Sequence, residues 1–325
     1  MTNPIIAEVT RGDTVESRHR GAYCVMDQTG RVVAAEGAIA AAIHPRSSSK
    51  AFQFLPVILS GASDRFGFTD EEIALACSSH GGEAEHVRVA RNMLKKAAND
   101  ESLYECGAHW PDDLAAHHAL VREGHACTQI HNNCSGKHAG MLALARQLGV
   151  DTKDYVKLEH PVQQEIARTM GAICDIDLSH QPWGIDGCSA PTWAIPIRNI
   201  ALGFTRLCAP GNAAGQRIIA AVRAHPFMVS GTGGFDTELM QAVPRVFVKG
   251  GAEGVHCGCI AHAGLGIAIK CDDGAGRAGE VAMAQVLASL DVWTPQERVA
   301  LERFRHQNLL NRRKIEVGAV LATVP

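Results

Sequence analysis

The sequence has few aromatic residues, no long apolar run and no block of charge of one sign. Aromatic residues make up 5% of the 325 positions, so an aromatic-rich binding surface is not expected. The net charge is -3 with both signs mixed, which excludes the basic footprint of a nucleic-acid-binding protein. No apolar run approaches the roughly 20 residues that a membrane-spanning helix needs. Residues 1–13 also lack the charged-then-apolar pattern of a secretory signal, so we expect a soluble, cytoplasmic protein.

Cysteine, in contrast, is abundant. The 11 cysteines are an odd number and are spread along the chain, unlike those of a small disulfide scaffold. In a reducing compartment we expect most of them to be free and buried, where they behave as small hydrophobic side chains. The chain is 46% hydrophobic and 20% charged, so it can bury a large core.

Strand patterns lie towards both ends of the chain, and helix patterns lie between them. Residues 21–37 predict an antiparallel hairpin with its turn at Asp27–Gly30. Further strands are predicted within 245–260, 264–274 and 315–324. Helices are predicted within 47–61, 68–77, 86–100, 136–149 and 160–174, from their apolar spacing and their capping residues.

These elements predict an α/β (α+β) fold, with an antiparallel sheet built from the N- and C-terminal segments and flanked by helices. No repeat or clear linker interrupts the chain, so we expect one domain over 1–325. Within it, residues 1–60 and about 190–325 form the sheet part, and residues from about 61 to 190 form a mainly helical part.

Three consecutive serines precede Lys50, and one of them has the spacing of a nucleophile. On a helix, residues three apart share a face with Cβ atoms about 5–6 Å apart. Only Ser47 has that spacing to Lys50, while Ser48 and Ser49 are left to capping and packing. A lysine amine can activate a serine hydroxyl if burial lowers the pKa of the lysine. Alone, however, the pair is better explained by an N-cap serine and a surface lysine.

A second feature supports chemistry. Serine acyl enzymes of the penicillin-binding and β-lactamase type combine Ser-x-x-Lys with a later Lys-Thr-Gly strand. Here Lys249-Gly250-Gly251 follows a predicted strand. The usual Ser-x-Asn element is absent, and Ser79, just after a predicted helix, is its nearest substitute. The combination indicates acyl transfer without naming the acyl donor.

Cys134 and Cys188 each lie in a glycine-rich turn, and such turns can expose a thiolate to a metal, most plausibly zinc. Spacing nominates His138, four residues after Cys134, as a third ligand. Two isolated cysteines in a chain of 11 are usually structural, so the residue pattern alone leaves the metal open. Cys257 and Cys259 alternate on a predicted strand and are interpreted as core residues.

Several motifs together resemble one known family, the Rhizobium etli-type (class 3) L-asparaginases. The motifs are PRSSSKAFQ, CSSHGGE, NNCSGKHAGM, HPVQQEI, WGIDGCSAPT, HPFMVSGTG and VKGGAEGV. The similarity extends from about Val15 to the C-terminus, and the motifs occur in the family's order. The resemblance implies a fold similar to serine β-lactamases and penicillin-binding proteins.

The resemblance also implies two Ser-Lys tandems, Ser47 with Lys50 and Ser79 with Lys249. Either tandem could supply the first nucleophile. The expected reaction is hydrolysis of the side-chain amide of L-asparagine to L-aspartate and ammonia through a serine acyl-enzyme. The resemblance further implies a homodimer.

In the same way, the resemblance implies a zinc site formed by Cys134, Lys137 and Cys188, with water completing the coordination. Lys137 thereby replaces His138 as the third ligand. A lysine binds metal only when it is deprotonated, so the site should weaken as the pH falls. Substrate binding is expected from three further residues, Arg46, Asp186 and His138.

Three alternative functions remain at this point. A serine-dependent glutaminase would use the same chemistry on a longer side chain. A β-lactamase or D,D-peptidase would share the Ser-x-x-Lys and Lys-x-Gly patterns. A non-catalytic zinc-binding protein would hydrolyse no amide and would leave both Ser-Lys tandems without a role.

Overall fold

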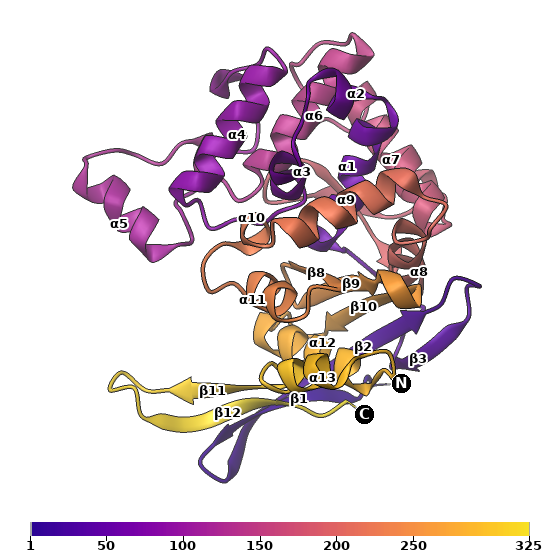
Figure 1. Cartoon of the computed structure of the whole chain (residues 1–325), viewed down its shortest axis with the longest axis vertical. Coiled ribbons are helices and arrows are strands. Elements are labelled where there is room, and N and C mark those ends of the chain that lie inside the picture. The colour runs from indigo at the N-terminus through magenta and orange to yellow at the C-terminus, as the bar shows by residue number, and fades with distance from the viewer. Residues whose placement is uncertain (1, 325) are drawn as a thin grey trace. The chain divides into compact units, whose positions relative to one another are not determined.

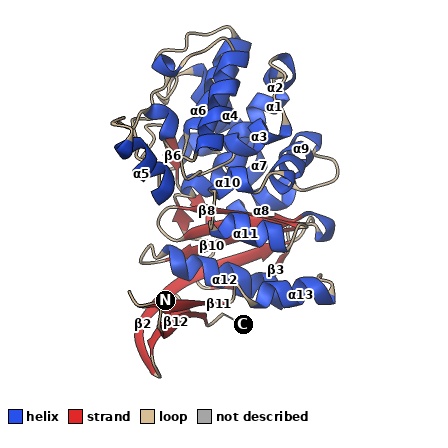
Figure 2. Cartoon of the chain, turned by 60° about the vertical axis from the view of Figure 1, so that its left-hand side comes forward, coloured by secondary structure: helices blue, strands red, loops and turns tan. Residues whose placement is uncertain are grey.

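The computed structural model describes residues 2–324, and these residues form two compact units. The sheet unit contains the described residues up to Ser48, the segment Ile195–Cys208, and the described residues from Leu239 onward. The helical unit contains Ser49–Ala194 and Ala209–Glu238. Figure 2 shows the strands of the first unit in red and the helices of the second in blue. The prediction of a single domain over 1–325 is not tested by this division and stays a prediction.

The sheet unit is built on an eight-stranded antiparallel sheet. Its strands follow the order β11-β12-β1-β2-β10-β9-β8, and β3 pairs with β2. The strands are β1 (Ile5–Arg11), β2 (Thr14–Met26), β3 (Val32–Glu36), β8 (Val246–Gly251), β9 (Val255–Ile260), β10 (Leu265–Cys271), β11 (His306–Leu310) and β12 (Glu316–Ala322). In Figure 1 the indigo N-terminal strands lie beside the orange and yellow C-terminal strands. The predicted antiparallel sheet from both ends of the chain is therefore confirmed.

Helices cover this sheet. Every residue of β9 is buried, so both faces of that strand are covered, and α8 and α12 pack against it. The helical and short segments of the unit are α8 (Ile197–Leu207), α12 (Gly276–Ser289), α13 (Pro295–Glu302), η5 (Ala261–Ala263), β4 (Ala42–Ile43) and β7 (Ile195–Pro196). Gly266 of β10 allows the close approach of α8, because a Cβ there would overlap the backbone of Ala201 and Thr205. Cys257 and Cys259 are core residues, as predicted.

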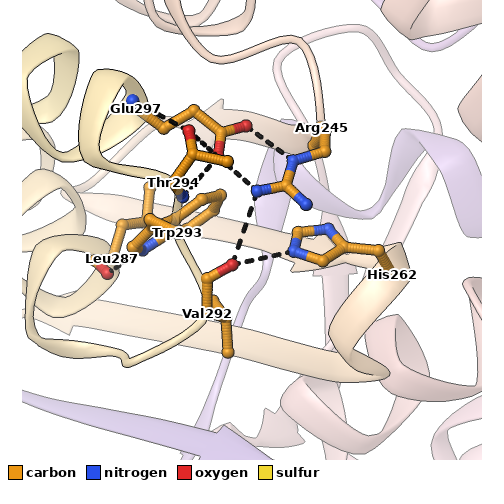
Figure 3. A network of polar contacts seen from close by, with 7 residues as sticks. All are labelled: Arg245, His262, Leu287, Val292, Trp293, Thr294 and Glu297. Atoms are coloured by element: carbon orange, nitrogen blue, oxygen red, sulfur yellow. Dashed lines mark hydrogen bonds and ion pairs between the residues drawn. The ribbon is translucent and has the colours of Figure 1, made fainter.

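A polar network fixes the start of β8, the strand that carries Lys249 (Figure 3). Arg245 Nε donates to Glu297 Oε1 at 2.6 Å, and a second Arg245 nitrogen donates to Glu297 Oε2. Glu297 also closes a capping box with Thr294 at the first turn of α13. The hydrogen bonds from Arg245 are the main reason that the pKa of Glu297 is lowered to about 2.

The helical unit holds most of the helices. They are α1 (Lys50–Leu59), α2 (Ala62–Arg65), α3 (Asp70–Ala76), α4 (Ala84–Lys96), α5 (Leu114–Arg122), α6 (Ser135–Leu148), α7 (Pro161–Cys174), α9 (Ala213–Ala224) and α10 (Phe227–Ser230). Short segments are η2 (Glu101–Leu103), η3 (Gln129–His131), η4 (Leu178–His180), β5 (Trp183–Ile185) and β6 (Pro191–Trp193). Two segments cross the boundary between the units, η1 (Arg46–Ser49) and α11 (Phe235–Ala242).

Local signals placed several of these helices correctly. Thr69 and Glu72 form the predicted capping box of α3. Helix α6 ends at Leu148 and is capped by Gly149 in the left-handed region, as its sequence predicted. One local prediction is wrong: Ser49 occupies the N-cap position of α1, but its side chain makes no capping hydrogen bond. Ser48 and Ser49 are both buried, so their packing role is as expected.

The cysteines agree with the prediction from composition. All 11 are free, and every one except Cys127 is buried. Within residues 2–324, no helix combines the length and the apolar character needed to cross a membrane.

Candidate active site

Lys50 lies at the centre of a buried polar cluster in the helical unit. It is the first residue of α1 and is only 1% exposed. Its Nζ donates to the backbone oxygen of Ser78, and to that of Asn133 at 3.2 Å. The same Nζ lies 3.1 Å from Ser79 Oγ. Since an ammonium group has three N–H donors, these three oxygens can satisfy it completely away from water.

The Lys50–Ser79 contact permits proton exchange in either direction. As an ammonium ion, Lys50 donates to Ser79 Oγ. As a neutral amine, it can donate to the two backbone oxygens and accept the Ser79 hydroxyl proton with its lone pair. The contact joins residues 29 positions apart, and the predicted tandems did not include it. Each predicted tandem joins one residue of the sheet unit to one of the helical unit, and both pairings stay predictions.

In the sheet unit, the end of β8 lies against the backbone that carries Ser47. A Cβ added at Gly251 would lie 2.8 Å from Pro45 O, 3.1 Å from Ser48 N and 3.4 Å from Ser47 N. Only a glycine allows this approach without displacement. Lys249, two residues earlier on β8, is 1% exposed, and its Nζ donates to Gly250 O at 2.6 Å. The Lys-x-Gly strand and the Ser-x-x-Lys segment therefore meet in space at the Ser47 backbone.

Arg46, which precedes Ser47, has an unusual backbone conformation. Its φ of 53° lies in the left-handed region, which costs a non-glycine residue about 1–2 kcal/mol. Such strain persists only where the surrounding structure enforces it, and it is frequent at functional sites. Ser48 Oγ donates to Pro45 O at 2.7 Å and thereby helps to hold this turn. The predicted role of Arg46 in substrate binding stays a prediction.

A cluster of thiols and an amine forms a second part of the site, also in the helical unit. Cys134 is the N-cap residue of α6, and Lys137 lies in the first turn of that helix. Cys188 lies in the turn between β5 and β6. Lys137 Nζ is 2.9 Å from Cys188 Sγ, and the Cys134 thiol donates a hydrogen bond to Cys188. The structure thus brings together all three residues that the resemblance nominated for zinc.

The charges in this cluster stabilise one another. The hydrogen bond from Cys134 lowers the pKa of the Cys188 thiol most strongly, and the positive charge of Lys137 lowers it further. Burial by itself lowers the pKa of Lys137, but the nearby Cys188 and Cys134 raise it, and the net shift is upward. The Cys188 thiol and the Lys137 amine therefore favour each other's charged form.

The donor set fits zinc. Thiolate sulfur and nitrogen are the ligands that zinc prefers in tetrahedral sites, and three protein ligands leave a fourth position for water. Because the pKa of Cys134 and the pKa of Lys137 are both raised in this cluster, a metal would have to displace a proton from each of them on binding.

His138 contacts Cys188, and the charge of Asp186 helps to raise the pKa of Lys137. His138 is fully buried, and burial is the main cause of its lowered pKa. Its Nδ1 lies 2.6 Å from the hydroxyl of Tyr155, and Cys188 contacts the same ring. Asp186, which is partly exposed, accepts a hydrogen bond from Gly187 N at 2.8 Å. The predicted substrate contacts of these two residues stay predictions.

Among the residues that the structure describes, one further group of His, Cys and Asp side chains could hold a metal ion: His19, Cys271 and Asp273. His19 Nδ1 lies 2.6 Å from Asp273 Oδ2, and the Cys271 thiol donates to Asp273 Oδ1 at 2.9 Å. Asp273 Oδ1 also accepts from Ala275 N, at the start of α12. These bonds satisfy the carboxylate and explain the group as a structural link between β2, β10 and α12.

Two contributors to the site were missed by sequence reasoning. The backbone oxygen of Asn133 accepts a hydrogen bond from Lys50, and a pattern of side chains in the sequence cannot predict a backbone acceptor. His80 follows Ser79 directly and is fully buried. Its position inside the CSSHGGE motif was the available signal for it.

The structure is a mixed α/β protein with an antiparallel sheet and a buried serine–lysine contact. Residues 7–322 match the L-asparaginase II family, and the chain belongs to that family.

Comparisons with individual proteins add little beyond the family. No curated protein matches the chain. Similar solved structures include a protein called Mglu in its native form, with 13% identity, 84% of this chain covered and a TM-score of 0.46. Another is a β-lactamase from Mycobacterium bovis, with 14% identity, 88% of this chain and 95% of that chain covered, and a TM-score of 0.42. The match spans 64% of the Mglu chain in that structure and 61% in a second one determined at 4.3 M NaCl, where the identity is 13% and the TM-score is 0.44.

Proposed function

We propose that the protein hydrolyses the side-chain amide of L-asparagine to L-aspartate and ammonia through a serine acyl-enzyme. Membership of the L-asparaginase II family supports the reaction class. The observation that carries the mechanism is the buried contact between Lys50 Nζ and Ser79 Oγ, through which a proton taken up by Lys50 can pass to Ser79.

In the proposed acylation step, Ser47 Oγ attacks the amide carbon and its proton passes to neutral Lys50. Backbone N–H groups near the start of α1 stabilise the developing oxyanion, because the N-terminal end of a helix favours negative charge. The C–N bond then breaks as the proton held by Lys50 passes through the Ser79 hydroxyl to the nitrogen, which leaves as ammonia, and Lys50 is neutral again. In this scheme Lys249 is the partner of Ser79 in the second Ser-Lys tandem. Water then attacks the ester, releasing aspartate and restoring the serine.

Zinc, when bound, would be held by Cys134, Lys137 and Cys188 and would supply a fixed positive charge. Its proposed role is to orient the substrate. No bond-making step requires it, since the serine is the nucleophile. Asp186 would pair with the ammonium group of the substrate, and Arg46 with its carboxylate.

Ammonia release from asparagine is the direct test. Wild-type protein, Ser47→Ala and Ser79→Ala are assayed with asparagine, glutamine and nitrocefin. We expect asparagine turnover in the wild type and a loss of at least about 10³-fold in kcat for Ser47→Ala. Near-normal turnover by Ser47→Ala together with an inactive Ser79→Ala would assign the nucleophile to Ser79. If the wild type hydrolyses glutamine or nitrocefin faster than asparagine, the proposed substrate is wrong and the protein is a glutaminase or a β-lactamase-like hydrolase. If it hydrolyses none of the three, the result supports a non-catalytic zinc-binding protein.

The attacking serine can also be identified directly. Protein quenched with acid during turnover is digested, and the peptides are searched by mass for an aspartyl ester. We expect the ester on the peptide that contains Ser47. The proposed homodimer is checked separately by light scattering of the purified protein, and a monomer at working concentration would exclude it.

A further inference from the structure

Two backbone segments meet at Lys50, and one side chain connects them. The first segment contains Ser78 and Ser79, and the second contains Asn133 at the start of α6. His80, at the end of the first segment, reaches Ser135 in the second, with Nε2 2.9 Å from Ser135 Oγ. His80 thus bridges the two backbone segments that surround the Lys50 amine.

The proton on His80 can be assigned from its partners. Gly82 N–H donates to His80 Nδ1 at 3.1 Å, and an N–H can only donate, so Nδ1 must be the unprotonated acceptor. The ring proton is therefore on Nε2, and it is donated to Ser135 Oγ. His80 in this tautomer cannot accept a proton from Ser135, which excludes a Ser135–His80 nucleophile–base pair.

The ring of His80 is also held in its plane. It stacks on His86 with centroids 4.9 Å apart, and His86 stacks on Phe227 at 4.7 Å. His80 is fully buried, and burial is the main cause of a pKa well below the usual histidine value. Ser79 N donates to Val229 O at 2.9 Å, so α10 supports the segment on its other side.

The approach of α6 to α3 requires a small residue. A Cβ at Gly136 would overlap the backbone of Leu75, near the end of the helix that leads to Ser78. Tyr104 OH donates to Ser135 O at 3.0 Å and fixes the first turn of α6. Because the packing of Gly136 against Leu75 and the hydrogen bond from Tyr104 hold the start of α6, His80 anchors the Ser79 segment to a rigid support.

We propose that His80 is a positioning residue for the reaction, holding the Ser79 hydroxyl against Lys50 Nζ through its hydrogen bond to Ser135. This inference rests on the proposed function. His80 does not take up or release a proton during turnover. Its contribution is geometric, because a proton passes efficiently between Ser79 and Lys50 only if their 3.1 Å separation is maintained.

The test compares variants that keep or remove the hydrogen bond. His80→Phe preserves the ring stack but removes both hydrogen bonds of the imidazole. We expect kcat to fall about 30-fold or more, with KM changing less than about threefold. His80→Gln offers an amide N–H near the position of Nε2 and should recover kcat to within about tenfold of the wild type. Exposed His125→Phe is the matched control and should leave kcat unchanged.

Ser135→Ala removes the acceptor and is expected to lower kcat about tenfold. In the double variant with His80→Phe, kcat should be no lower than in His80→Phe alone, because the two residues act through one bond. A folded His80→Phe protein with kcat within threefold of the wild type would overturn the inference. The inference would also be overturned if the loss of kcat in the double variant equalled the product of the losses in the two single variants.

A spectroscopic measurement separates this inference from the proposed reaction. In protein labelled with ¹⁵N-histidine, long-range ¹H–¹⁵N correlation spectra report the tautomer without any substrate. We expect a neutral Nε2–H tautomer for His80, unchanged between pH 6 and 9. A Nδ1–H tautomer, or titration of the ring in that range, would refute the inference even in an active enzyme. A wild type inert towards asparagine with the expected tautomer would refute the proposed function instead.

Discussion

Replacement of Gly251 by alanine should disturb the backbone of Ser47 without touching any proposed catalytic side chain. The added Cβ would lie 2.8 Å from Pro45 O and 3.1 Å from Ser48 N, where ordinary contacts begin near 3.4 Å. Both contacting atoms belong to the backbone, which cannot rotate away as the end of a long side chain would. The turn around Ser47 must therefore shift.

The size of the effect follows from these distances. Relieving the overlap with Pro45 O requires a movement of about 0.6 Å, and overpacking of this kind typically costs about 1–3 kcal/mol of stability. A misplacement of 1 Å at a reacting group can cost about 10²-fold in rate. A movement of just over half that size should therefore lower kcat about tenfold, with a smaller change in KM.

The assay is ammonia release from asparagine, combined with urea unfolding of both proteins. Gly211→Ala is the matched control, because a Cβ at Gly211 meets no atom within 4 Å. The control should retain both kcat and stability. If Gly251→Ala retains kcat within twofold and unfolds at the same urea concentration, the contact between β8 and the Ser47 turn does not constrain the site as argued.

Three further predictions concern charge and metal. The pKa of Glu297 is about 2 in the folded protein against a usual 4.5, so its ionised form stabilises the fold above about pH 4.5 and this stabilisation is lost as the pH falls through 2. The free energy of unfolding of Glu297→Gln at pH 7 should therefore be about 1–3 kcal/mol lower than that of the wild type, and this difference should shrink towards pH 2. A difference that does not change with pH would argue against the ion pair with Arg245. Cys134→Ser should lose the zinc that elemental analysis finds in the wild type, and equal metal content in both proteins would remove Cys134 from the ligand set. Lys50→Met should lower kcat by at least about 10³-fold while the protein stays folded, and turnover near that of the wild type would exclude Lys50 as the base for either serine.

Local patterns predicted the elements that carry strong local signals. The capping box of Thr69 and Glu72, the glycine cap at Gly149 and the turn at Asp27–Gly30 each satisfy backbone groups within a few residues. The structure therefore matches the sequence prediction at these points. Helices α8, α9, α12 and α13 and strands β1 and β11 were not predicted, and their stability depends more on what they pack against.

The candidate site likewise contains residues that the sequence nominated and features that only the structure shows. Motif spacing and family resemblance nominated Cys134, Lys137 and Cys188, and the folded chain brings them together. The role of His138 was ambiguous from spacing, because it lies four residues from Cys134 and one from Lys137. Its burial and its hydrogen bond to Tyr155 could be seen only in three dimensions.

The sequence by itself determined the family, the antiparallel sheet drawn from both termini, and the free state of the cysteines. These properties depend on composition, on periodic patterns and on motifs that are contiguous along the chain. The tertiary structure decided which groups surround Lys50, because Ser79 and Asn133 reach it from segments 29 and 83 residues away. No local spacing encodes such contacts. They arise when a buried amine must find oxygen partners from whichever backbone segments the packing of α1, α3 and α6 brings within reach.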